Sequence, residues 1–150
     1  MKQGPLTDTE LRQAVYRWVI SRGEIPTSDQ IAHAANISKQ EVLDGFARLA
    51  DAHVFVLQRN NEILMAMPFS AVPTPFLITA RGRSHYYANC AWDAFGIPIM
   101  LRSDGKISSA CGCCGTAIHI SMRGGAIQSG EGVVHFAIPA KHWWDNVVYT

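Results

Sequence analysis

Cys90, Trp92 and Asp93 carry the strongest chemical signal in the chain. If residues 86–93 are helical, Cys90 and Asp93 lie three positions apart and therefore on the same face of that helix. A thiolate is a soft metal ligand, and a carboxyl group can hold or pass a proton. The spacing predicts one small site at which a metal is bound and a proton is moved.

Each of these two residues also has a plain structural interpretation. A cysteine alone is more often a small buried hydrophobic residue than a nucleophile. Asp93 could face solvent or cap a neighbouring backbone. Its neighbours Trp92, Phe95 and Ile97 favour a functional role, because a carboxyl group among apolar side chains is costly to bury without a use.

A second group of sulfur atoms follows in residues 111–115, which read Cys-Gly-Cys-Cys-Gly. Cys111 and Cys114 form a C-x-x-C pair, which is only half of a zinc ribbon. The expected flanking strands disfavour a thioredoxin-like motif, in which the pair opens a helix. The remaining interpretations are metal binding by Cys111, Cys113 and Cys114, or a tight glycine turn with incidental thiols.

The composition excludes several classes of protein. With 13 basic and 12 acidic residues the net charge is +1, so no electrostatic argument favours nucleic acid or an anionic membrane. The N-terminus is not followed by an apolar segment, and no apolar run is long enough to span a bilayer, so we expect neither a signal peptide nor a membrane anchor. We therefore expect a cytoplasmic protein with reduced cysteines.

Residues 1–70 predict a winged-helix-like module of three helices and a β-hairpin. Thr7 or Asp8 caps the first helix, Thr27 or Ser28 opens the second, and Ser38 with Glu41 forms a capping box for the third. The expected strands are residues 53–58 and 62–67, joined by a turn at 60–61.

DNA binding is the familiar use of such a module, but the third helix argues against it. Lys39 and Arg48 are outnumbered there by Glu41, Asp44 and Asp51. An acidic helix is unsuited to phosphate contact. We therefore expect a structural or protein-contacting role and no nucleic acid partner.

Residues 71–150 predict a mostly antiparallel β domain with a short helix that carries the Cys/Asp site, which makes the whole chain α+β. Residues 68–75 are expected to form a proline-rich linker, and Gly96 with Pro98 is expected to end the helix. The expected strands are 76–79, 98–102, 106–109, 116–122, 132–138 and 147–150, with a helical turn at 141–146.

The stretch 74–115 resembles the bacterial organomercurial (alkylmercury) lyases. The matching pieces are Thr74-Pro75-Phe76, Gly82-Arg83, Tyr87-Ala88-Asn89-Cys90-Ala91-Trp92-Asp93, Pro98, Ser108-Ser109-Ala110-Cys111 and Gly115. The N-terminal module also suits that family, in which it packs on the catalytic domain.

The resemblance implies protonolysis of a carbon–mercury bond, which gives a hydrocarbon and Hg²⁺. It matches Cys90 to the first thiolate that grips mercury and Asp93 to the proton carrier, and it matches Cys111 to a structural cysteine. Mercury is then substrate and product, the partner is a small organometallic compound, and no organic cofactor is needed.

One departure from the family pattern concerns its second thiolate, which lies just after the segment that matches residues 143–150. The chain given ends at Thr150, so it is a fragment, or a sulfur from elsewhere replaces that thiolate, or the protein is not a lyase. Cys113 and Cys114 are extra and are candidates for the replacement. The alternatives are a non-catalytic relative that binds a soft metal through Cys90 and the 111–114 loop, and a metal-responsive winged-helix regulator.

Overall fold

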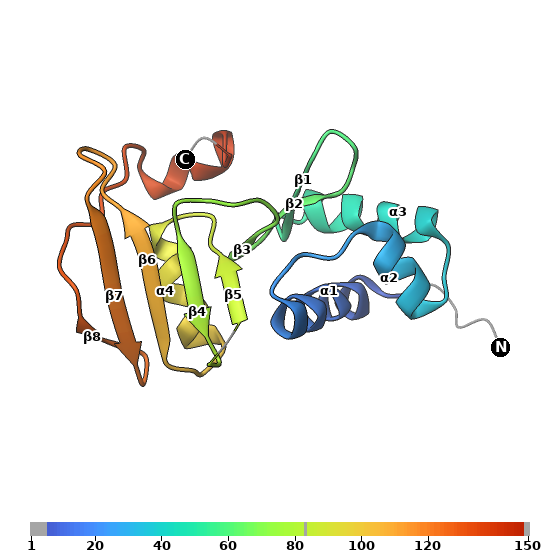
Figure 1. The fold of residues 1–150 in the computed structure, drawn as a ribbon. Coiled ribbons are helices and arrows are strands. Elements are labelled where there is room, and N and C mark those ends of the chain that lie inside the picture. Colours follow the sequence, from blue (N-terminus) through green and yellow to red (C-terminus); the bar gives the residue numbers. More distant parts are fainter. Residues whose placement is uncertain (1–5, 83, 149–150) are drawn as a thin grey trace.

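The computed structural model describes residues 6–82 and 84–148. Helices occupy the N-terminal part of the chain and a five-stranded sheet occupies the C-terminal part (Figure 1). A small three-stranded sheet lies between them. The expected α+β class, with three N-terminal helices before a mostly antiparallel β domain, is confirmed.

Each of the first three helices begins at a complete capping box, in which a hydroxyl and a carboxyl or amide side chain satisfy free backbone N–H groups. The caps are Thr7 with Glu10, Thr27 with Gln30, and Ser38 with Glu41. The helices are α1 (Asp8–Arg22), α2 (Ser28–Ala35) and α3 (Lys39–Asp51). All three predicted helix starts are therefore correct.

Both basic side chains of α3 form ion pairs with acidic residues of the other two helices. Lys39 Nζ lies 2.8 Å from Asp29, and an Arg48 guanidinium nitrogen lies 2.8 Å from Asp8. Both pairs are exposed, so they add little to the free energy of unfolding. Each basic side chain of α3 thus has an acidic partner on another helix.

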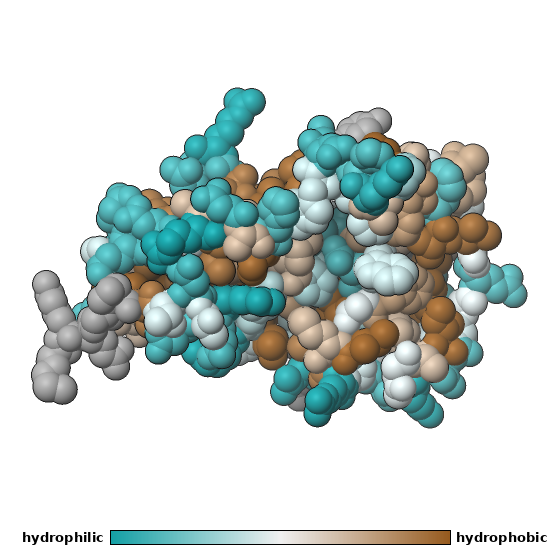
Figure 2. All heavy atoms as spheres, turned by 180° about the vertical axis from the view of Figure 1, so that it is seen from behind, coloured by the Kyte–Doolittle hydropathy of each residue, from teal (hydrophilic) through white to brown (hydrophobic). Residues whose placement is uncertain are grey.

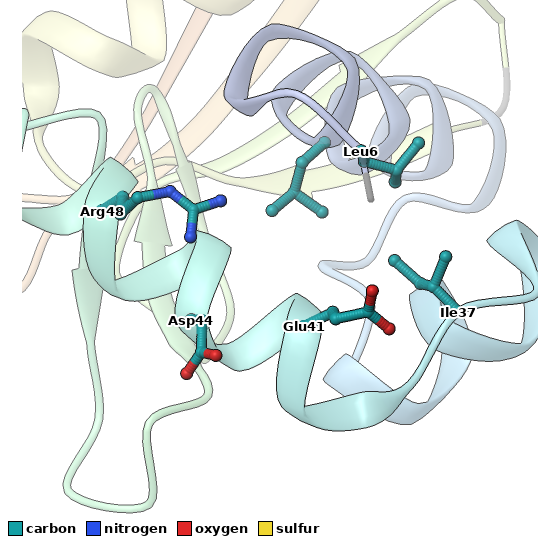
Figure 3. Close-up of a pocket in the computed structure, with 6 residues that line it drawn as sticks. Leu6, Ile37, Glu41, Asp44 and Arg48 are labelled. Atoms are coloured by element: carbon teal, nitrogen blue, oxygen red, sulfur yellow. The ribbon is translucent and has the colours of Figure 1, made fainter. Parts of the chain in front are cut away.

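A small hollow of about 90 Å³ lies between α1 and α3 (Figure 3). Leu6 and Ile37 contribute apolar walls, and the polar groups at its rim have partners of their own. Glu41 accepts from Ser38, and Arg48 pairs with Asp8. We assign this hollow no chemistry, because its charged groups serve helix caps and ion pairs.

The antiparallel three-stranded sheet consists of β1 (Phe55–Leu57), β2 (Ile63–Ala66) and β3 (Phe69–Ser70). The predicted hairpin of β1 and β2 is confirmed. The expected linker at 68–75 is partly wrong, because β3 pairs with β2. Phe69 also forms a bridge to Ala88, so β3 ties the helical half to the larger sheet.

The larger sheet is antiparallel with the strand order β5-β4-β6-β7-β8. Its strands are β4 (Leu77–Ala80), β5 (Ser84–Tyr87), β6 (Gly105–Ala110), β7 (Ala117–Arg123) and β8 (Ala126–Ser129). Helix α4 (Ala91–Met100) packs on β4 and β6, behind the sheet in the view of Figure 1.

The prediction that Gly96 and Pro98 end the fourth helix is wrong, as is the predicted strand at 98–102. Helix α4 continues to Met100 with Pro98 inside it. Pro98 is buried, and its Cγ would lie 2.6 Å from a Cβ at position 105. Packing of the proline ring on Gly105 therefore offsets the missing backbone N–H, which ordinarily weakens a helix interior.

The predicted strand at 132–138 is also wrong. The turn at Gly124 and Gly125 instead pairs β7 with β8, and Val133 is left 93% exposed. A short turn closes a hairpin locally, so β8 forms from the nearer residues. The expected helical turn at 141–146 is present as the 3-10 helix η1 (Ala140–Asp145). Of the expected strand at 147–150, residues 147–148 form a turn and 149–150 lie outside the described residues.

One buried core runs through both halves. The rings of Phe69 and Tyr86 lie 5.4 Å apart, and the Tyr86 hydroxyl donates to the Ile20 carbonyl at 3.1 Å. Seen from behind, hydrophobic residues gather on the half that holds the sheet and α4 (Figure 2). The large apolar side chains of α4 that are exposed are Trp92, Ile99 and Met100. Across residues 6–82 and 84–148, no helix has the length and apolarity to span a membrane.

Candidate functional site

Cys90 lies at the start of α4, one residue before its first turn. The condition that residues 86–93 are helical is met only from Ala91 onward, because β5 extends through Tyr87 and Cys90 has extended backbone angles (φ −150°, ψ 179°). Its carbonyl accepts the first helical bond, from Ala94 N at 3.0 Å. Cys90 is thus the N-cap and Asp93 the third helical residue. The N-cap and third helical positions lie at the same end of the helix and both side chains line one cavity, so the predicted proximity is retained, although Cys90 forms no side-chain cap hydrogen bond.

The Cys90 thiol and the Asp93 carboxyl line a cavity of about 150 Å³. The cavity lies between the start of α4, the end of the small sheet and the C-terminal segment. Its other walls are apolar, aromatic or sulfur-containing side chains together with one amide: Met65, Met67, Asn89, Trp92, Phe136, Trp143, Trp144, Val147 and Val148. A carboxyl group in such surroundings is poorly solvated.

Burial changes the proton affinity of both reactive groups. It raises the pKa of Asp93 above the usual range of a carboxyl group, while hydrogen bonds with Cys90 and Asn89 oppose the shift. Burial also raises the pKa of Cys90, and the Asp93 charge adds to that rise. The proton therefore binds more tightly to each group than in water.

Asn89 connects this pair to the small sheet. Its side-chain Nδ2 lies 3.4 Å from the Met67 sulfur, and its backbone N–H donates to the Pro68 carbonyl at 3.3 Å. Its amide is also a hydrogen-bond partner of Asp93. Within the described residues the buried Asn89 Oδ1 has no partner. Asn89 thereby joins the start of α4 to the end of the small sheet.

The C-terminal segment covers the cavity with aromatic rings. Phe136 and Trp143 have ring centroids 4.9 Å apart, and Trp143 Nε1 donates to the Ile138 carbonyl at 2.8 Å. Trp144 stacks on His53 at 4.2 Å with an interplanar angle of 8°. These contacts fix an apolar wall opposite Cys90.

The other predicted metal ligands lie elsewhere. Cys111, Cys113 and Cys114 occupy the turn between β6 and β7 and are absent from the cavity lining; Cys111 is half-buried, and Cys113 and Cys114 are exposed. Across the described part of the chain, no group of three or more His, Cys, Asp or Glu side chains could hold a metal ion. The structure therefore unites Cys90 with Asp93 but not with the loop thiols.

The sequence analysis did not assign Met65, Met67, Asn89, Phe136, Trp143 or Trp144 to the site. These residues come from three separate segments, which only the tertiary fold brings together. The one local signal was the adjacent pair Trp143 and Trp144, since two neighbouring indoles near a chemically active helix can indicate an apolar binding wall.

The fold and the site together define an α+β protein that carries a cysteine and an aspartate at the start of one helix. The family model of MerB, the alkylmercury lyases, matches residues 69–150, so the chain belongs to the alkylmercury lyase family.

A crystal structure of the mercury-bound form of MerB2 has a similar fold, with a TM-score of 0.61 and 24% sequence identity. The alignment covers 81% of this chain and 59% of that one, so this chain spans little more than half of the solved protein. The curated proteins contain no match to the sequence.

Proposed function

We propose that this protein cleaves the carbon–mercury bond of small organomercurials by protonolysis, with Cys90 as the mercury ligand and Asp93 as the proton carrier. The observation that carries the proposal is that a thiol and a carboxyl group line one largely apolar cavity. Membership of the alkylmercury lyase family supports it. Residues 71–150 would form the reacting domain, and residues 1–70 a structural module packed against it.

The first step transfers the Cys90 thiol proton to the Asp93 carboxylate. The raised pKa of Asp93, which burial causes, makes this carboxylate a better proton acceptor than an exposed one. The Cys90 thiolate then bonds to mercury in R–Hg–X, and X⁻ leaves.

The second step returns the proton to carbon. Asp93 protonates the carbon atom bound to mercury, the carbon–mercury bond breaks, and R–H leaves. Its electron pair goes to the new carbon–hydrogen bond, so Hg²⁺ remains on the Cys90 thiolate and Asp93 is again a carboxylate. No organic cofactor takes part. The thioethers of Met65 and Met67 are further soft donors that line the same cavity.

The test is hydrocarbon release from methylmercury or phenylmercuric acetate in excess small thiol, measured by gas chromatography. Cys90→Ser and Asp93→Ala are each expected to abolish release above the thiol-only background. Cys113→Ser is the matched control, because it removes an exposed thiol that does not line the cavity. A fully active Cys90→Ser protein would refute the assignment.

A non-catalytic metal-binding relative is the second candidate, and the loop thiols favour it. It predicts stoichiometric Hg²⁺ uptake without hydrocarbon release in the same assay. A DNA-binding regulator has less support, because Lys39 and Arg48 are already paired with Asp29 and Asp8. Either thiol-based function needs reduced cysteines, which the cytoplasm maintains.

A further inference from the structure

The Cys-Gly-Cys-Cys-Gly turn carries three thiols that do not line the cavity. Backbone bonds close the turn at both ends: Cys111 N–H donates to the Thr116 carbonyl at 2.8 Å, and Gly115 N–H donates to the Cys111 carbonyl at 2.8 Å. Gly115 adopts φ 72°, which glycine accommodates without strain. The fold of the turn is therefore maintained by the backbone and does not require its thiols.

Cys111 and Cys114 are three residues apart in this turn, and the backbone bond from Gly115 to Cys111 brings their two positions close together. The Cys114 sulfur lies 3.1 Å from the Thr116 hydroxyl, and the Cys111 side chain is a further hydrogen-bond partner of Cys114. Cys114 is exposed and Cys111 half-buried, so a solute can reach the pair without entering the protein. Cys113 is also exposed but lies outside this pair.

The surroundings of Cys114 favour its thiolate. The Thr116 hydroxyl and backbone, followed by the Cys111 side chain, lower the pKa of Cys114, whereas burial raises the pKa of Cys90. The two sulfur sites thus differ in accessibility and in proton affinity. Cys114 is therefore the more accessible thiol, whereas Cys90 is half-buried in the wall of the cavity.

The number of ligand atoms at this turn determines which class of cation it can bind. Zn²⁺ in structural sites takes four ligands. A third ligand from His, Cys, Asp or Glu is missing beside this pair in the part of the chain that the structure describes. Hg²⁺ is satisfied by two sulfur atoms, and thiolates prefer soft cations.

We propose that Cys111 and Cys114 form a second, surface-exposed site that binds one thiophilic cation of the Hg²⁺ type without help from Cys90. Two thiols each bond to the cation through sulfur and release one proton each, so two protons appear per cation bound. The site goes beyond the cleavage reaction, and it does not depend on that reaction taking place.

The experiment titrates the full chain carrying Cys90→Ser with HgCl₂ in the presence of a competing monothiol. Native mass spectrometry gives the stoichiometry, and the ultraviolet mercury–thiolate absorption gives the affinity. One Hg²⁺ per chain is expected, with two protons released. Adding Cys111→Ser or Cys114→Ser is expected to weaken binding about a hundredfold or more, because two linked donors lose their effective concentration.

Cys113→Ser in the same Cys90→Ser background is the matched control and is expected to bind Hg²⁺ unchanged. An equal loss of Hg²⁺ affinity in the Cys113→Ser variant, or a complex that contains two chains per cation, would overturn the proposal. Binding of Zn²⁺ as tight as that of Hg²⁺ would also overturn it. Circular dichroism confirms that each variant is folded. Because Cys90 is absent throughout, the outcome is independent of whether the protein cleaves organomercurials.

Discussion

The thiol of Cys90 and the carboxyl group of Asp93 lie at the N-terminal end of one helix, the first as its N-cap and the second in its first turn. The free N–H groups of a helix start favour negative charge, whereas burial in this cavity disfavours it. One shared proton satisfies both influences, because the pair then carries a single negative charge. This relationship underlies the proposed chemistry and most of the following predictions.

Replacing Asp93 with Asn should remove the proton carrier while preserving the shape of the site. We expect hydrocarbon release to fall about a hundredfold or more, the usual contribution of a positioned acid or base. Mercury uptake by Cys90 should persist, as measured by native mass spectrometry. Asp51→Asn, which changes an exposed carboxyl group at the end of α3, should leave both readings unchanged.

The raised pKa of Asp93, which burial causes, predicts how its charge affects stability. The folded protein binds this proton more tightly than the unfolded chain does, so ionisation of Asp93 lowers the free energy of unfolding as pH rises through the folded pKa. Below the unfolded value of about 3.9 both states are protonated and the penalty vanishes. Urea unfolding should therefore show Asp93→Asn at least as stable as wild type at pH 7, with the gap closing on acidification. A clearly less stable variant at pH 7 would contradict this sign.

The two classes of thiol should react with iodoacetamide at different rates. Cys114 is exposed and has a pKa that its Thr116 hydrogen bonds lower, whereas burial raises the pKa of Cys90. Thiolates are the reactive form. Peptide mass spectrometry at neutral pH should find Cys114 alkylated well before Cys90. Asp93→Asn should accelerate Cys90, because it removes a neighbouring negative charge that raises the Cys90 pKa.

The contact between the two halves should be measurable as stability. Phe69→Ala removes a fully buried ring from that contact and should lower the free energy of unfolding by about 3–5 kcal/mol. Tyr86→Phe removes only the hydrogen bond to Ile20 and should cost about 1 kcal/mol. Tyr87→Phe, one residue further along β5 and less buried, should stay within about 0.5 kcal/mol of wild type. A large effect of Tyr87→Phe would contradict this assignment.

Local sequence signals predicted the helical half well. The capping boxes at Thr7, Thr27 and Ser38 depend on residues only three positions apart, so the sequence contains all that determines them. The strand at β7 was likewise predicted from strict alternation.

The errors arose where distant residues decide the structure. Pro98 stays inside α4 because it packs on Gly105, and residues 132–138 form no strand because β8 already occupies the edge of β7. The Cys90 and Asp93 pair was predictable from spacing, but its cavity was not. Met67, Phe136 and Trp143 come from segments that only the folded chain brings together.

The most direct test of the account is the isotopic composition of methane released from methylmercury in D₂O. Protonolysis through Asp93 transfers one solvent-exchanged hydrogen to carbon, so the protein should release singly deuterated methane, detected by mass spectrometry of the headspace. Cys90→Ser should release none above a protein-free control with the same thiol, and Asp93→Asn should release about a hundredfold less than wild type or lower. Absence of deuterated methane from the wild-type protein, or its equal release by the Cys90→Ser protein, would contradict the proposal that these two residues cleave the carbon–mercury bond.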